Sequence, residues 1–297
     1  MGTLSEKALD LDEMQALLPK FTNALRSFAS SNAKFQLLNT VGASSTPPSA
    51  QTLYVLDSSF NPPTRAHFKM AVSALENDRG KLPKRLLLLL ATSNADKAPK
   101  PASFEQRLTM MTMIAHDLHT HASCHSAAVD IGLTSEPYFM AKSYAISDSS
   151  VYTTPAVDAE SPKTSSPEQV WLTGYDTLTR IFDPKYYSPT HTLAPLEPFL
   201  QAHRIRATFR PDDSWGSIEE QEDFLRQMAQ GGREKEGGKR EWAERIELVE
   251  GRTEGEEIIS STKVRAASKR RDEAELGKLV NERVRDWILH EHLYTEE

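Results

Sequence analysis

The sequence predicts an α/β protein built on a doubly wound parallel sheet, with helices on both faces. Two short apolar segments, residues 53–57 and 85–91, have the length and composition of buried strands, and residues 64–75 between them have helical periodicity. A strand, a helix and a second strand in succession form a right-handed parallel unit. Because this alternation continues through most of the chain, we expect the strands to join in one sheet.

The remaining elements follow from the same periodicities. Further strands are expected at residues 127–131, 169–173, 205–210 and 246–249. Further helices are expected at residues 12–30, 104–118, 138–146, 176–182 and 219–230, and from residue 262 to the end of the chain.

The chain divides into a short extension and one main domain. Residues 1–50 are expected to form an N-terminal helix with a linker, and residues 51–297 are expected to form the domain. Two insertions interrupt this domain. One is rich in Ser, Thr and Pro and lies near residues 147–168, and the other is a charged loop near residues 231–241 that we expect to be mobile.

Composition excludes several classes of protein. The chain has 297 residues and a net charge of −7, from 35 Lys and Arg against 42 Asp and Glu, which argues against a general nucleic-acid binder. Its longest apolar run, residues 86–91, is far below the roughly 18 residues of a membrane span. An acidic N-terminus and the single cysteine, Cys124, fit a reducing compartment. We therefore expect a cytoplasmic or nuclear protein with no membrane partner. The protein could form a homo-oligomer, and the sequence leaves this open.

The first stretch that carries chemistry is residues 57–67, which read DSSFNPPTRAH. It joins the first expected strand of the sheet to the first helix, and ligands bind at this edge of open α/β sheets. The N–H groups that begin the helix suit a phosphate, and His67 stands in the first helical turn. The simpler alternative is an ordinary strand–turn–helix with a histidine that only packs or caps.

The second stretch is residues 259–265, which read ISSTKVR. Three hydroxyl residues at the expected helix start are natural N-caps, and Arg265 follows within one turn. Hydroxyls, N–H groups and a guanidinium together suit an anion with several oxygens, such as a polyphosphate. Taken alone, the stretch also fits a capped helix with a solvated arginine.

Together, the two stretches resemble the paired elements of the HxGH nucleotidylyltransferase superfamily, (T/H)xxH and ISSTxxR. Within it, the sequence is most similar to the nicotinamide mononucleotide adenylyltransferases of eukaryotes, fungi included. The segments WLTGYD at residues 171–176 and VRDWILHEHLY at residues 284–294 also resemble elements of that family. The resemblance runs in order from about residue 53 to residue 294.

This resemblance implies a Rossmann-like fold and a reaction of NAD biosynthesis. The phosphate of nicotinamide mononucleotide would attack the α-phosphorus of ATP, giving NAD and pyrophosphate, with Mg²⁺ bound to the ATP phosphates. The implied partners are therefore ATP and nicotinamide mononucleotide.

The resemblance also implies roles for individual residues. His67 would donate a hydrogen bond to the α-phosphate, and Arg265 would hold the leaving phosphates. Lys97 matches a phosphate-contacting lysine that follows the second strand, and Lys100 competes with it for that role. Further contacts to the phosphates of ATP and of the mononucleotide would come from Ser59, Phe60, Thr64, Ser260, Ser261 and Thr262.

Other residues match the positions that bind the sugar and the base. Gly174 and Asp176 would contact the adenosine ribose, because a carboxylate accepts hydrogen bonds from two hydroxyls. The family usually stacks nicotinamide between tryptophans, and here Tyr138 and Tyr187 are the candidates for stacking, although exposed tyrosines are often simple surface residues.

The sequence departs from the family in two respects. Ser58 stands where glycine is usual, and the tryptophans are missing. Two alternatives therefore stay open: a related enzyme with another acceptor, such as a pantetheine or choline phosphate, or a nucleotide-binding regulatory module without turnover. No metal ligands are expected from protein side chains, since the histidines around residues 116–125 fit no familiar zinc spacing.

Overall fold

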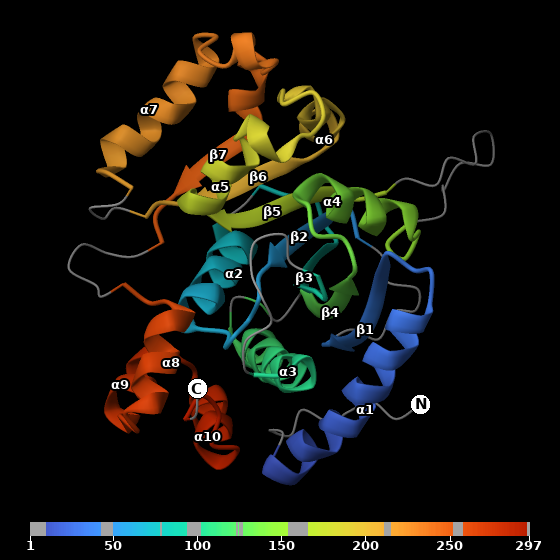
Figure 1. Cartoon of the computed structure of the whole chain (residues 1–297), viewed down its shortest axis with the longest axis vertical. Helices are drawn as coiled ribbons and strands as arrows, with labels where there is room; N and C mark the ends of the chain where they lie inside the picture. Colours follow the sequence, from blue (N-terminus) through green and yellow to red (C-terminus); the bar gives the residue numbers. More distant parts are fainter. Residues whose placement is uncertain are drawn as a thin grey trace.

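A computed structural model describes residues 10–42, 50–77, 79–93, 102–122, 124, 127–153, 166–210, 215–251 and 258–295. Its centre is a seven-stranded sheet in the order β1-β4-β3-β2-β5-β6-β7, parallel except for β1, which runs antiparallel to β4 (Figure 1). The strands are β1 (Phe35–Val41), β2 (Thr52–Asp57), β3 (Lys84–Ala91), β4 (Ala128–Thr134), β5 (Glu168–Gly174), β6 (Arg204–Thr208) and β7 (Ile246–Val249).

Helices cover both faces of this sheet. The α-helices are α1 (Leu11–Ser30), α2 (Arg65–Asn77), α3 (Phe104–Thr120), α4 (Phe139–Asp148), α5 (Tyr175–Ile181), α6 (Glu197–Ala202), α7 (Ile218–Ala229), α8 (Ser261–Lys269), α9 (Glu273–Leu279) and α10 (Glu282–His290). Short 3₁₀ turns are η1 (Pro184–Tyr186), η2 (Ala194–Leu196), η3 (Glu234–Glu236) and η4 (Arg240–Arg245). Within the described ranges, no helix is both long and apolar enough to cross a bilayer.

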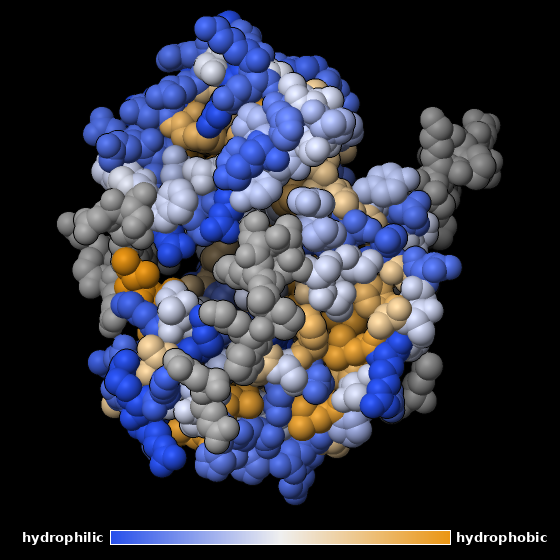
Figure 2. Space-filling model, viewed as in Figure 1, coloured by the Kyte–Doolittle hydropathy of each residue, from blue (hydrophilic) through white to orange (hydrophobic). Residues whose placement is uncertain are grey.

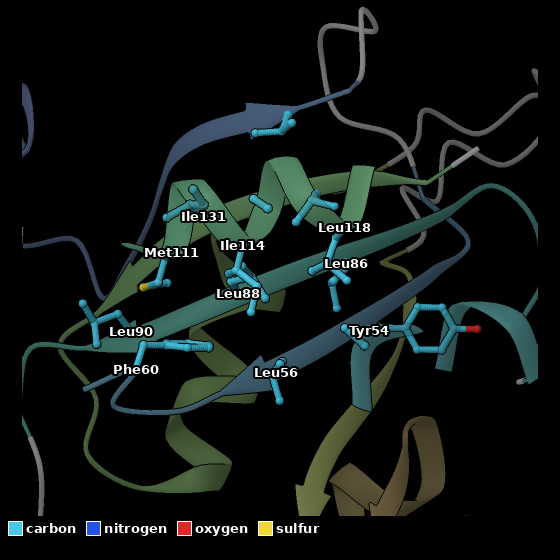
Figure 3. Close-up of a cluster of buried hydrophobic side chains, with 14 of the residues drawn as sticks. Tyr54, Leu56, Phe60, Leu86, Leu88, Leu90, Met111, Ile114, Leu118 and Ile131 are labelled. Carbon is cyan, nitrogen blue, oxygen red and sulfur yellow. The ribbon is translucent and has the colours of Figure 1, made fainter. Parts of the chain in front are cut away.

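Strand alternation divides the core into two layers. Leu56 and Leu88 point to the face that α1, α2 and α3 cover, where they join the buried cluster of Figure 3. Val55 and Leu89 point to the opposite face, which α4, α5, α6 and α7 cover. Strands that are apolar on both faces are typical of a parallel sheet buried between helices. The predicted doubly wound α/β architecture is therefore confirmed.

The strand order also fixes the place of the ligand crevice. The chain runs from β2 outward through β3 and β4, and then returns to β5 on the other side of β2. Such a reversal leaves a crevice at the carboxyl ends of the two central strands, and open α/β sheets bind ligands there. In this protein the topology therefore predicts ligand binding at the ends of β2 and β5.

The first fifty residues contain an element that the sequence interpretation missed. Helix α1 is present as expected, with a capping box between Asp10 and Glu13, but the edge strand β1 follows it, in residues to which the sequence interpretation assigned no strand. A register shift between Leu37 and Asn39 breaks the alternation of side chains that signals a strand, which explains why periodicity did not reveal it. In Figure 2, apolar side chains gather near this edge, between α4 and α1.

Two other expectations need correction. The charged loop near residues 231–241 is not a loose segment, because 3₁₀ turns and the ion pairs Arg240–Glu234 and Arg233–Glu236, both at 2.7 Å, organise it. The tail after residue 262 is three helices, α8, α9 and α10, which share a third buried cluster with α3. The turns between these helices allow each of the three to place apolar side chains in that cluster.

Candidate functional site

The candidate site lies at the carboxyl end of β2, where the loop of residues 58–64 leads into α2. His67 is in the first turn of this helix, as the sequence predicts. Its Nδ1 accepts the backbone N–H of Thr64 at 3.0 Å and lies 2.8 Å from the hydroxyl of Thr64. Since Nδ1 is an acceptor, a neutral ring carries its proton on Nε2.

The other ring nitrogen contacts a side chain at the start of the same loop. Nε2 of His67 lies 3.0 Å from the hydroxyl of Ser58, to which it donates. Burial lowers the pKa of His67 to about 4, so the ring is neutral at physiological pH. The site therefore holds an oriented, uncharged N–H donor. Ser58, where the family resemblance led us to expect glycine, is the residue that holds this donor, a role that sequence reasoning missed.

Phe60 contributes to the site through its backbone. Its side chain is fully buried in the cluster under β2 and β3, as Figure 3 shows, and its ring lies 5.2 Å from that of His67. Its φ of +42° is unusual for a bulky residue. Packing of the ring holds the loop in this shape, and only backbone atoms of Phe60 remain to meet a phosphate.

The second motif packs directly against this loop (Figure 1). Ser260 is the N-cap of α8 and accepts the N–H of Lys263 at 3.3 Å. The hydroxyl of Ser261 donates to the carbonyl of Pro62 at 2.8 Å. These contacts place the N–H groups that begin α8 beside the loop that leads to α2.

Arg265 links the same two segments. Its Nη1 donates to the carbonyl of Asn61 at 2.7 Å, and its Nη2 donates to the hydroxyl of Thr262 at 3.1 Å. The guanidinium and the imidazole of His67 thus border one loop, although they are almost two hundred positions apart in the chain. Two helix starts, one fixed cation and one neutral donor make an anion site suited to several phosphates.

A buried network, which the sequence did not indicate, supports the loop from behind. The side-chain oxygen of Asn61 accepts the N–H of Ala102 at 2.8 Å and the hydroxyl of Tyr294 at 2.9 Å. Arg107 in turn donates to the carbonyl of Ala102 at 2.8 Å. Tyr294, near the end of the described chain, therefore holds the side chain of Asn61, and Arg265 binds the backbone carbonyl of the same residue.

The neighbouring strand β5 brings Gly174 and Asp176 to the same edge. Gly174 is the N-cap of α5, and a Cβ atom at this position would lie 2.7 Å from a carboxylate oxygen of Asp176. Its φ of −86° is ordinary, so the effect of glycine here is to leave room for the Asp176 carboxylate. Asp176 forms an ion pair with Arg210 at 3.1 Å, and its side chain remains 23% exposed.

The two stacking candidates differ in their surroundings. Tyr138 precedes α4 and is 52% exposed, so its ring is accessible for stacking. Tyr187 donates its hydroxyl to the carbonyl of Ile181 at 2.6 Å and packs into the core beside α5. Burial raises the pKa of Tyr187, which is consistent with a packing role. The structure favours Tyr138 over Tyr187.

Lys97 and Lys100 lie outside the described residues. Among the residues that the structure does describe, no group of three or more His, Cys, Asp and Glu side chains could hold a metal ion.

Comparison with known proteins identifies the family. No family model matches the chain. A protein of Schizosaccharomyces pombe, provisionally named a nicotinamide mononucleotide adenylyltransferase, is 31% identical over 267 residues, which cover 89% of this chain and 93% of that protein. The chain belongs to the nicotinamide mononucleotide adenylyltransferase family. The family resemblance predicted from the motifs is thus confirmed.

Solved structures agree at the level of the fold. A Plasmodium falciparum nicotinic acid mononucleotide adenylyltransferase complexed with APC is 14% identical, with a TM-score of 0.50 over 83% of this chain and 98% of that chain. The same enzyme complexed with NaAD is 15% identical, with a TM-score of 0.48 over the same shares. At this identity the first likeness supports the doubly wound nucleotidyltransferase fold alone.

Proposed function

We propose that the protein transfers the adenylyl group of ATP to nicotinamide mononucleotide, giving NAD and pyrophosphate. The observation that carries this proposal is the convergence of His67 and Arg265 on one loop at the carboxyl end of β2. The name of the Schizosaccharomyces pombe relative supports the same reaction.

The reaction needs positioning and charge neutralisation. An oxygen of the mononucleotide phosphate attacks the α-phosphorus of ATP in line, the bond from this phosphorus to the β-bridging oxygen breaks, and pyrophosphate leaves. No proton must be removed from a phosphate oxygen that is already ionised, so a neutral histidine suits the site. Nε2–H of His67 can exchange the Ser58 hydroxyl for an α-phosphate oxygen and donate to it as negative charge builds there.

The start of α8 suits the leaving group. The hydroxyl of Thr262, the first N–H groups of α8 and the guanidinium of Arg265 together stabilise the β- and γ-phosphates. The hydroxyl of Ser261, which donates to the carbonyl of Pro62, instead holds this helix start against the loop. Mg²⁺ enters with ATP as part of the substrate, since this ion commonly binds phosphate oxygens and keeps several waters. Ser59 and the backbone of Phe60 bind the acceptor phosphate, and Lys97 stays a predicted phosphate contact.

The test is direct synthesis of NAD by the purified protein. With ATP, Mg²⁺ and nicotinamide mononucleotide, we expect NAD and pyrophosphate in equal amounts. Parallel reactions with nicotinate mononucleotide, phosphopantetheine and phosphocholine define the acceptor. Pyrophosphate release with only one of the last two would place the enzyme in another branch of the superfamily. No dinucleotide from any acceptor, despite ATP binding, would identify a module without turnover and contradict the proposal.

A further inference from the structure

A second charged pair stands at the carboxyl edge of the sheet, outside the phosphate site. Asp57 is the last residue of β2, and Lys142 of α4 donates from Nζ to its Oδ2 at 2.6 Å. The side chain of Asp57 points to the same face as Leu53 and Val55, the face that α4 covers. The Lys142 side chain is 10% exposed and that of Asp57 is 22% exposed. The carboxylate is therefore the more accessible partner.

A largely buried ion pair such as this one contributes little net stability to the fold. Desolvation offsets most of the attraction in a largely buried ion pair, and apolar residues of similar volume often serve as well. Lys142 binds one carboxylate oxygen of Asp57, and among the described residues no group donates to the other, Oδ1. A fixed carboxylate with an accessible oxygen is a hydrogen-bond acceptor for a ligand.

The position of the pair matches the middle of the acceptor mononucleotide. Asp57 is two residues before Ser59, which is placed at the acceptor phosphate. Lys142 is one helical turn after Tyr138, the candidate that can stack on the base, and its N–H donates to the carbonyl of Tyr138 at 3.0 Å. A mononucleotide that reaches from Ser59 to Tyr138 carries its ribose between them, beside the carboxylate of Asp57.

The adjacent strand repeats the arrangement. Beyond the end of β5, Asp176 is held by Arg210 just as Asp57 is held by Lys142. Strands β2 and β5 are paired in parallel, with Leu56 opposite Leu172, so both carboxylates stand at the same edge of the crevice. The dinucleotide product contains two riboses, and the edge offers two anchored carboxylates.

We infer that Asp57 binds the ribose diol of the acceptor mononucleotide and that Lys142 fixes its carboxylate for this purpose. The inference rests on the proposed function. It assigns each of the two riboses to a carboxylate at the end of a different strand. Asp57 at β2 accepts hydrogen bonds from the acceptor sugar, and Asp176 at β5 accepts them from the sugar of ATP.

Analogues without the two ribose hydroxyls test this assignment. The measured quantity is the ratio of kcat/KM for the natural substrate to kcat/KM for its 2′,3′-dideoxy form, taken separately for the mononucleotide and for ATP. Hydrogen bonds to a charged group predict a ratio of about 10 to 100 for the mononucleotide with the unmodified enzyme. Asp57→Asn should reduce this ratio to below about 3 and leave the ATP ratio unchanged. Asp176→Asn should do the reverse.

Matched variants separate binding from folding. The ratio does not depend on the fraction of folded enzyme, and the double variant Asp57→Asn/Lys142→Gln, which leaves no unpaired charge, should give the same low ratio. Glu168→Gln is the control variant. It breaks an ion pair with Arg204 at the amino ends of strands β5 and β6, far from the proposed ribose contacts, and should change neither ratio.

Several outcomes would overturn the inference. Asp57 would be structural if both Asp57 variants kept the ratio of the unmodified enzyme while NAD formation continued. A fall in the ATP ratio in those variants would assign Asp57 to the wrong sugar. If the unmodified enzyme formed no NAD, the proposed function would fail first and this inference would fall with it.

Discussion

The two edges of the sheet hold similar side chains and differ in the helix ends beside them. At the carboxyl edge, His67 accepts a backbone N–H through Nδ1. At the amino edge, His203 also accepts a backbone N–H through Nδ1, from Gln169 at 3.1 Å. Burial lowers the pKa of each ring to about 4, so both are neutral donors of the same tautomer.

What differs is the electrostatic setting. His67 is in the first turn of α2 and beside the start of α8, where N–H groups and positive dipole ends are concentrated. His203 is the C-cap of α6, where carbonyl groups and the negative dipole end are concentrated. The same imidazole is thus suited to a phosphate at one edge and to packing at the other. The comparison teaches that helix polarity, rather than the state of the histidine, decides which edge can bind a polyphosphate.

The largest expected effect comes from removing the donor at the carboxyl edge. His67→Ala should lower kcat for NAD formation by about 100- to 1,000-fold, the usual loss for one donor to a developing oxyanion. Initial rates at saturating substrates measure it. His203→Ala is the matched control and should keep kcat per folded molecule, as judged by active-site titration. Equal losses in both variants would mean that His67 acts only through the fold.

Acid stability sharpens the same comparison. Each histidine has a folded-state pKa of about 4, below its ordinary value of 6.5, so the unfolded chain binds more protons between these two pH values. The contribution of each neutral histidine to the free energy of unfolding should be fully present above pH 6.5. It should fall by about 3 kcal/mol for each histidine as the pH drops toward 4. Urea unfolding from pH 7 to pH 4 measures this fall. Each His→Ala variant should lose about half of it, and an unchanged pH dependence would contradict the burial of that ring.

The smallest expected effect tests the support behind the loop. Tyr294→Phe removes one hydrogen bond to Asn61, which keeps its bond from Ala102. A net hydrogen bond contributes about 1 kcal/mol, so kcat should fall about fivefold with little change in KM for ATP. Tyr144→Phe, on the 72% exposed Tyr144, is the control and should leave kcat unchanged. A rise in KM at constant kcat would show that Tyr294 affects binding and not the alignment of the phosphates.

Local patterns in the sequence predicted most of the fold and both of the motifs that the structure brings together. Strands β2 and β3 contain continuous apolar runs, and β5 contains a shorter one. Helix α8 begins at hydroxyl residues that are natural caps, and α2 follows a distinctive motif. These signals were sufficient because each is complete within about ten residues. Strand β1 escaped because its bulge interrupts the alternation, and Tyr294 and Lys142 escaped because their partners are distant in sequence.

The sequence by itself determined the elements, the two motifs and the residue types that can bind phosphate, because backbone periodicity and helix capping are local. Only the tertiary structure decided that Arg265 bonds to the loop before His67, that Asp57 faces α4, and that Tyr138 is exposed while Tyr187 is partly buried. These outcomes depend on how helices pack on the sheet. Packing depends on many contacts between segments that are distant in the sequence, so no short stretch of sequence can predict it.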